Sequence, residues 1–189
     1  EISQKTGTGI SYETSNPYMA CSSESEQGFC PQGKWDCSAE NVARTCSTFP
    51  PAGKCSGLSQ YPNVTISEYG SISGKSALMK EIYARGPISC GINAEPILDY
   101  TGGIFKKKVF GGTDHVISVV GWGQDGSGVF GPEQYWIVRN SWGEFWGEMG
   151  YIRVAFGTLS LEEQCSWAVP DVITTKNFPC YEGGENCQA

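Results

Sequence analysis

A change in the spacing of apolar residues divides the middle of the chain into one helix and a set of strands. Between Gly74 and Arg85 apolar residues recur at roughly helical spacing, which predicts a helix capped by Ser73 and ended by Gly86 and Pro87. After that point apolar residues alternate with small or polar ones, which is the period of a strand. Strands are predicted at residues 88–92, 115–122, 134–140 and 150–156. One helix followed by strands and glycine-rich turns favours an antiparallel, barrel-like sheet.

The two ends of the chain show less periodicity. Residues 1–62 are predicted to be irregular, with cross-links in place of a large core. Their cysteines are Cys21, Cys30, Cys37, Cys46 and Cys55. These spacings lack the tight Cys-x-x-Cys or Cys/His pairs of a zinc site, so disulfide-braced loops are predicted and no metal is expected. Residues 171–189 read as an extension in which Cys180 and Cys187 close a small disulfide loop.

Composition limits the kinds of molecule that the protein is expected to bind. The chain has 189 residues and a formal net charge of -7, which argues against a nucleic acid or an anionic membrane as partner. Residues 106–108 are a short lysine run, interpreted as a solvated loop. No apolar stretch is long enough for a membrane span, and the first residues lack a signal-peptide pattern. Nine cysteines indicate an oxidising compartment, and the odd count leaves one without a partner in this chain.

The chemistry is concentrated in two short blocks. The single histidine, His115, follows Asp114 and opens an apolar strand, and Asn140 begins the sequence Asn-Ser-Trp-Gly twenty-five residues later. An imidazole that takes a proton from a thiol must be held in one tautomer, and an asparagine oxygen can do this. The plain alternatives are a strand-end histidine, a turn asparagine and, for Trp142 and Trp146, ordinary core aromatics. What favours a catalytic site over these alternatives is that the order and spacing of the two blocks match those of a known family.

These blocks resemble the histidine and asparagine segments of the papain-like cysteine proteases. Residues 86–92, 140–144 and 161–165 are most similar to the cathepsin X (cathepsin Z) type within that family. The resemblance runs from about residue 13 to 170 and is strongest over 70–150. It implies a papain-like α+β fold. Residues 1–62 would be the disulfide-rich end of the left domain, residues 63–170 the right β-barrel domain that carries the histidine and the asparagine, and residues 171–189 a C-terminal extension.

The family signature around the reactive cysteine, C-G-[SA]-C-[WY], does not occur in this chain. Of the nine cysteines only Cys180 precedes an aromatic residue of that kind, and it lacks the residues that should come before it. The resemblance therefore implies a C-terminal chain or fragment of a cysteine peptidase. Its partners would be an N-terminal segment or chain that supplies the nucleophile, and a peptide or protein substrate hydrolysed through a thioester. The expected location is the lysosome, the vacuole or the extracellular space, and no cofactor is expected.

The resemblance also assigns roles to individual residues. It implies that His115 and Asn140 are catalytic, and that Trp142 shields their contact and flanks the side of the cleft that binds the C-terminal part of the substrate. Trp146 would support Trp142. The remaining assignments are a substrate-binding wall of Gly91, Thr113 and Asp114, a disulfide between Cys90 and Cys165, glycosylation of Asn63 in a surface loop, and Cys21 as the odd cysteine.

Two other functions remain open from the sequence. The first is a catalytically inactive papain-fold relative that serves as a binding or structural subunit of a larger assembly. The second is a secreted disulfide-rich inhibitor or lectin-like domain, which would explain the cysteines but not the histidine block. In the family, a segment near the reactive cysteine decides between endopeptidase and carboxypeptidase action, so both stay open here.

Overall fold

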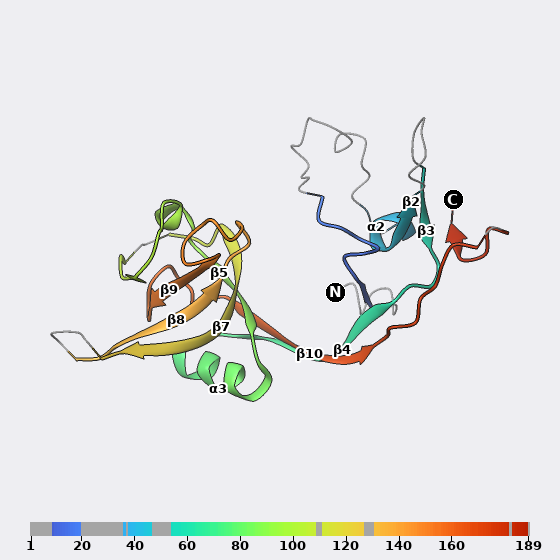
Figure 1. Ribbon diagram of the computed structural model, residues 1–189. Helices are drawn as coiled ribbons and strands as arrows, with labels where there is room; N and C mark the ends of the chain where they lie inside the picture. The colour runs from blue at the N-terminus through green and yellow to red at the C-terminus, as the bar shows by residue number, and fades with distance from the viewer. Residues whose placement is uncertain are drawn as a thin grey trace. The chain divides into compact units, whose positions relative to one another are not determined.

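The computed structural model (Figure 1) forms two compact units. It describes residues 9–19, 36, 38–46, 54–108, 111–126, 131–181 and 183–188. Unit 1 combines residues 1–67 with 170–189, and unit 2 is residues 68–169. The domain boundaries expected from the sequence, at residues 62 and 170, stay a prediction. No helix within the described part of the chain is both long and apolar enough to cross a membrane.

The described elements are mostly strands. Their bounds are β1 (Ile10–Ser11), α2 (Ala39–Val42), β2 (Arg44–Cys46), β3 (Cys55–Leu58), β4 (Asn63–Ile72), α3 (Lys75–Arg85), β5 (Ile88–Ile92), η2 (Glu95–Ile97), β6 (Ile104–Phe105), β7 (His115–Asp125), β8 (Glu133–Arg139), β9 (Tyr151–Ala155), β10 (Cys165–Ile173) and β11 (Cys187–Gln188). The four strands predicted from alternation correspond to β5, β7, β8 and β9, with ends that differ by three residues or fewer.

Unit 2 is built on a twisted sheet whose strands follow the order β10-β5-β7-β8-β9-β6. The pairs β5–β7, β7–β8 and β8–β9 are antiparallel, as predicted, and β7 carries a bulge between Val119 and Gly121. Strand β6 departs from the predicted antiparallel pattern because it pairs with β9 in parallel. A parallel pair needs a long crossover connection, and the chain between β6 and β9 contains two further strands of the same sheet.

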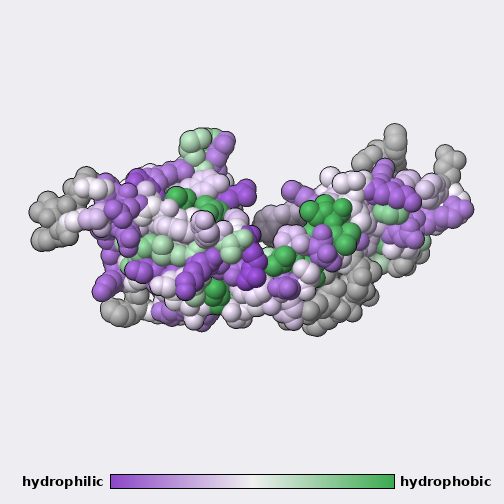
Figure 2. Space-filling model, turned by 90° about the horizontal axis from the view of Figure 1, so that it is seen from below, coloured by the Kyte–Doolittle hydropathy of each residue, from purple (hydrophilic) through white to green (hydrophobic). Residues whose placement is uncertain are grey.

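Inward-facing residues of these strands form the core of unit 2. Trp136 and Val138 of β8 and Val119 of β7 are fully buried, and Ile152 and Val154 of β9 are nearly so. The alternation read from the sequence therefore corresponds to one buried and one more exposed face of the sheet. The surface seen in Figure 2 is mostly hydrophilic or neutral, with hydrophobic residues in small separate groups.

Helix α3 begins differently from the prediction. The N-cap is Gly74 with φ of 85°, and no side chain caps the helix, so the predicted role of Ser73 is wrong. The Gly74 backbone N–H instead donates to the carbonyl oxygen of Glu162, 2.8 Å away. A tertiary contact thus replaces the local cap, and glycine suits the positive φ that this contact requires.

Unit 1 contains more regular structure than predicted. Strands β11, β3 and β2 form an antiparallel sheet, and Ala43, Leu58 and Tyr61 form a small buried cluster. The prediction that these segments are irregular is therefore wrong, whereas the predicted disulfide bracing is present between Cys46 and Cys55. Their strands are only two to four residues long, too short to show a period.

Disulfides reinforce unit 1. Cys46 is bonded to Cys55 and Cys180 to Cys187. The extension at 171–189 contributes β11 to the same sheet as β3. Cys21, the expected odd cysteine, lies outside the described residues, as do Cys30 and Cys37.

Asn63 is not in a surface loop as expected. It is the first residue of β4, pairs with Ser11 of β1 and is half-buried. Its Nδ2 donates to the carbonyl oxygen of Tyr61 at 3.4 Å. The Asn-Val-Thr tripeptide thus begins a strand because β1 is available to pair with it, and its glycosylation stays a prediction.

Candidate active site

The sheet brings His115 and Asn140 together. His115 is the first residue of β7, and Asn140 follows the last residue of β8. Because β7 and β8 are antiparallel, with Ser118 opposite Arg139, the start of one strand meets the end of the other. The Nε2 atom of His115 lies 2.8 Å from Oδ1 of Asn140. Residues twenty-five positions apart in the sequence thus form one hydrogen-bonded pair.

The hydrogen bonds of Asn140 identify the tautomer of the imidazole. Oδ1 also accepts the backbone N–H of Ser141 at 2.8 Å, so the oxygen of the amide must point to this side. An amide oxygen only accepts, and therefore Nε2 of His115 carries the proton and donates it. Nδ1 is then the nitrogen free to act as a base. Asn140 is only 8% exposed, which keeps water from competing for this contact.

Trp142 packs on the imidazole of this pair. Its ring stacks on the His115 ring, with centroids 5.0 Å apart and an interplanar angle of 27°. Trp146 packs edge-on against Trp142 at 5.1 Å and 82°. The Nε1–H of Trp146 is itself shared between the carbonyl oxygens of Ile97 and Leu98, both 3.1 Å away. The imidazole is therefore oriented from one side by an amide and from another by an anchored pair of indoles.

An ion pair holds the loop that carries these indoles. The Arg153 guanidinium binds the Glu148 carboxylate through two nitrogens, at 2.6 and 2.9 Å. These hydrogen bonds are the main reason that the pKa of Glu148 is lowered and that of Arg153 raised. Glu148 also accepts the backbone N–H of Gly103 at 2.9 Å. The loop after β8 is thereby tied both to β9 and to the segment before β6.

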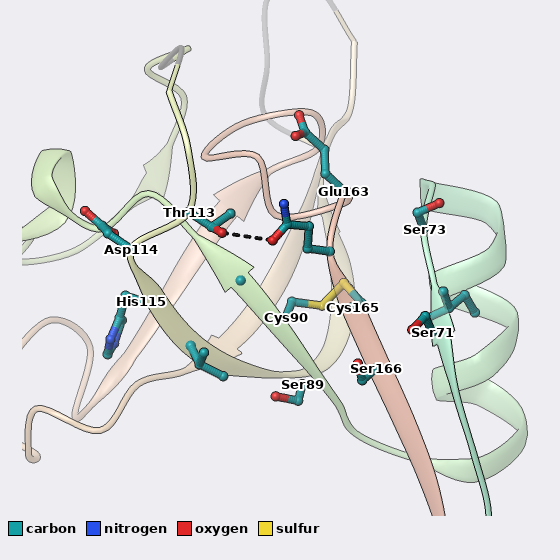
Figure 3. A pocket seen from close by; sticks show the side chains of 14 residues that line it. Ser71, Ser73, Ser89, Cys90, Thr113, Asp114, His115, Glu163, Cys165 and Ser166 are labelled. Carbon is teal, nitrogen blue, oxygen red and sulfur yellow. Dashed lines mark hydrogen bonds between the residues drawn. A yellow bond between two sulfur atoms is a disulfide. The ribbon is translucent and has the colours of Figure 1, made fainter. Parts of the chain in front are cut away.

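A cavity of about 800 Å³ opens beside His115. Its wall includes the three residues expected to contact substrate, Gly91, Thr113 and Asp114, together with the Cys90–Cys165 disulfide. Figure 3 shows this disulfide in the cavity wall, with Thr113, Asp114 and His115 to one side of it.

Gly91 lies close against Thr113 in this wall. A Cβ atom at Gly91 would lie only 3.1 Å from the side chain of Thr113. The carboxylate of Asp114 does not simply face the cavity, because its Oδ1 accepts the backbone N–H of Ala94 at 2.8 Å. Thr113 therefore lies close against β5, and Asp114 fixes the segment that leads into His115.

Sequence reasoning missed Gln164. Its side-chain oxygen accepts the Thr113 hydroxyl at 3.0 Å, drawn as the dashed line in Figure 3, and its backbone oxygen accepts the N–H of Gly91 at 2.8 Å. A signal was present, since a disulfide between Cys90 and Cys165 must bring their neighbours together. Within the described residues, no group of three or more histidine, cysteine or acidic side chains could hold a metal ion.

Comparison with known proteins places this geometry in a family. A model of the papain family cysteine proteases matches residues 2–172. Cathepsin Z from Onchocerca volvulus is 37% identical over 177 residues, covering 86% of this chain and 50% of the relative. Fruit bromelain from Ananas comosus is 30% identical over 184 residues, covering 97% of this chain and 42% of the relative. The chain thus spans about half the length of the curated relatives it matches.

A solved structure shares the fold. The bromelain protease from Ananas comosus, in complex with the E64 inhibitor, superposes with a TM-score of 0.57 at 24% identity, covering 87% of this chain and 64% of that one. The mixed α+β architecture expected from the sequence is thereby confirmed. By sequence and by fold, this chain belongs to the papain family of cysteine proteases.

Proposed function

We propose that this chain is the base-bearing part of a cathepsin X-like cysteine peptidase, and that a segment outside the chain supplies the nucleophilic cysteine. The observation that carries the proposal is the hydrogen bond of 2.8 Å between His115 and Asn140 beneath the Trp142 ring. This arrangement leaves Nδ1 of one oriented imidazole available to a thiol. By itself the chain has a base without an attacking group, so it is inactive until the other segment is in place.

The mechanism follows from the orientation of the ring. His115 accepts the thiol proton at Nδ1, and the resulting imidazolium stabilises the thiolate, as in papain, where the cysteine pKa is about 3–4. The thiolate attacks the scissile carbonyl carbon, and the C–N bond breaks as Nδ1–H protonates the leaving amine. Water then hydrolyses the thioester, with Nδ1 taking the proton from that water. Asn140 keeps Nε2–H engaged through each step.

The cavity beside His115 is the proposed substrate site. Gly91 and Thr113 form one wall of it, and Gln164 supports Thr113. Because Gly91 has no side chain and Thr113 is small, this wall leaves room for a substrate side chain on the N-terminal side of the scissile bond. A peptide or protein is the proposed substrate, and no nucleic acid is expected because the net charge is -7.

The secretory route, ending in the lysosome, the vacuole or outside the cell, is the proposed location. Three disulfides join described cysteines, and disulfides persist in oxidising compartments. Use of the Asn63 sequon belongs to the same proposal, since N-linked glycans are added on this route. Release of a glycan from secreted material by an amidase that acts on Asn-linked sugars, seen as a mass loss, would test it.

Kinetics of the assembled protein test the proposed function. The chain is expressed together with the segment that carries the thiol, and hydrolysis of an internally quenched peptide is followed. The variant His115→Ala should lower kcat by about 10²–10⁴-fold, the usual contribution of a positioned acid–base group. Tyr83→Ala is the matched control, because Tyr83 is an exposed aromatic residue on α3. Equal activity of the His115 and Tyr83 variants would contradict the proposal.

A further inference from the structure

The turn at residues 147–150, which ends the loop between β8 and β9, has an unfavourable backbone conformation. Gly147, Met149 and Gly150 have φ angles of 60°, 55° and 85°. Glycine adopts a positive φ at little cost, but methionine does not. Met149 is also 79% exposed, so burial of its side chain does not hold it there. A strained backbone persists only where neighbouring contacts enforce it, and strained residues are concentrated at functional sites.

Glu148 supplies the enforcing contacts from the middle of this turn. Its carboxylate accepts hydrogen bonds from the Arg153 guanidinium on β9 and from the backbone N–H of Gly103. Its backbone N–H donates to the carbonyl oxygen of Tyr151 at 2.9 Å, and the Tyr151 N–H donates back to the Glu148 carbonyl oxygen at 3.1 Å. Side chain and backbone of one residue thus tie the turn to β9 and to the segment before β6.

Backbone hydrogen bonds connect the turn to the asparagine that orients the imidazole. The N–H of Asn140 donates to the carbonyl oxygen of Gly150 at 3.0 Å, and the N–H of Gly150 donates to that of Trp146 at 2.8 Å. A Cβ atom at Gly150 would lie 3.2 Å from the carbonyl oxygen of Gly143, so the two arms of the loop are in close contact. A shift of the turn would therefore move Asn140, and also Trp146, which packs against Trp142.

We infer that Glu148 is a positioning residue, which sets the orientation of the His115 imidazole through the turn at 147–150. This inference rests on the proposed function and adds to it a residue on which the base depends. While Glu148 holds the turn, Asn140 stays where its Oδ1 accepts Nε2–H of His115. Without the carboxylate, the strained backbone at Met149 is free to relax. Asn140 and Trp146, which are hydrogen-bonded to the turn, then lose their fixed positions.

The tautomer ratio of the His115 ring in the full chain tests this inference without catalysis. It is measured by 15N NMR at a pH where the ring is neutral. Glu148→Gln keeps the length of the side chain and removes its charge, and should raise the ratio of the Nδ1–H to the Nε2–H tautomer about two- to fivefold. The rise should be smaller than in Asn140→Ala, which removes the acceptor itself. A purely structural role would lower the unfolding free energy and leave the ratio in the folded chain unchanged.

Glu133→Gln is the matched control, because Glu133 also forms an ion pair in unit 2, with Lys106. Its side chain is 27% exposed, against 30% for Glu148, and it begins β8, at the end away from Asn140. This variant should leave the tautomer ratio unchanged. Arg153→Lys keeps the cation but cannot bind the carboxylate through two nitrogens. It should shift the ratio in the same direction as Glu148→Gln, and it decides the question if Glu148→Gln does not fold. An unchanged ratio in the folded variants at 148 and 153, or an equal shift in Glu133→Gln, would overturn the inference.

The assembled peptidase separates this inference from the proposed function. Glu148→Gln should lower kcat by about tenfold, because a small misplacement of a catalytic group slows the reaction strongly. KM should change by less than about twofold, because no uniform binding of the substrate is lost. An assembled protein that hydrolyses no peptide would overturn the proposed function, while the tautomer ratio would still decide whether Glu148 positions the ring. Active enzyme with the same kcat in the native and Glu148→Gln forms would overturn the inference alone.

Discussion

The Nε2 atom of His115, the first residue of β7, lies 2.8 Å from the Oδ1 atom of Asn140, which directly follows β8. Because Ser141 donates its backbone N–H to the same oxygen, the amide can only accept from the imidazole. The hydrogen-bond network thus selects the Nε2–H tautomer and leaves Nδ1 as the base. This relationship connects the fold to the proposed chemistry.

Removal of the Asn140 side-chain amide should change the tautomer equilibrium of the His115 ring. In Asn140→Ala, Nε2–H loses its acceptor, so the fraction of the Nδ1–H tautomer should rise; 15N NMR of the histidine ring measures it at a pH where the ring is neutral. Asn140→Asp retains an oxygen acceptor and should keep the Nε2–H form. An unchanged tautomer ratio in the alanine variant would show that Asn140 does not orient the ring.

Loss of the indole that stacks on His115 should destabilise unit 2. Trp142 makes one ring contact with His115 and one with Trp146, and an aromatic pair contributes about 0.5–1.5 kcal/mol. Trp142→Ala should therefore lower the unfolding free energy by about 1–2 kcal/mol in urea titrations. Trp142→Phe keeps a ring and should lose less. A loss that is the same for both substitutions would mean that the ring contacts contribute nothing.

The Cys90–Cys165 disulfide should stabilise the protein more than the Cys180–Cys187 disulfide does. It joins residues 75 positions apart, and closing a loop of that length restricts the unfolded chain by an amount worth about 2–4 kcal/mol. The double variant Cys90→Ser/Cys165→Ser should have an unfolding free energy lower by this amount in urea titrations. The pair Cys180→Ser/Cys187→Ser, which opens a loop of only 7 residues, should lose less. A larger loss of unfolding free energy in the Cys180/Cys187 variant than in the Cys90/Cys165 variant would contradict an origin in loop-closure entropy.

The Glu148–Arg153 ion pair should make stability depend on acid pH. The folded state lowers the pKa of Glu148 below its ordinary value of 4.5, chiefly through hydrogen bonds from Arg153. The stabilisation is therefore complete above that value and is lost as pH falls through the lowered pKa. Glu148→Gln should cost about 1 kcal/mol at pH 7, since solvent screens part of the interaction, and the difference from the native chain should shrink below pH 4.5.

A double-mutant cycle with Arg153→Gln isolates this pair from other carboxylates. The coupling free energy between positions 148 and 153 should be present at pH 7 and vanish at low pH. Strict additivity of the two substitutions at pH 7 would mean that the ion pair does not stabilise the loop.

Sequence reasoning predicted the parts of the fold that local pattern determines. Strands β5, β7, β8 and β9 alternate buried and exposed residues, and the predicted ranges correspond to them. His115 and Asn140 could be placed at strand ends for the same reason. The local sequence pattern did not predict the structure where residues distant in the sequence determine it. Gly74 begins α3 because its N–H reaches Glu162, a contact invisible in the residues around the helix.

The candidate site was only partly predictable. The roles of Trp142 and Trp146 came from resemblance, and alternation gives no indication of ring stacking between a strand and a loop. Gln164 was missed because its contact with Thr113 joins two distant segments, and only the expected Cys90–Cys165 bridge indicated that these segments meet.

The most direct test of the central claim is labelling of native material that contains this chain. A thiol-directed epoxide is added, and intact masses are measured before and after reduction of disulfides. Because the label requires an activated thiolate, the account predicts that it attaches to a cysteine in sequence outside these 189 residues, and that blocking the active site with it abolishes peptide hydrolysis. Hydrolysis that survives labelling, or material that takes up no label at all, would contradict the claim that His115 and Asn140 activate a thiol.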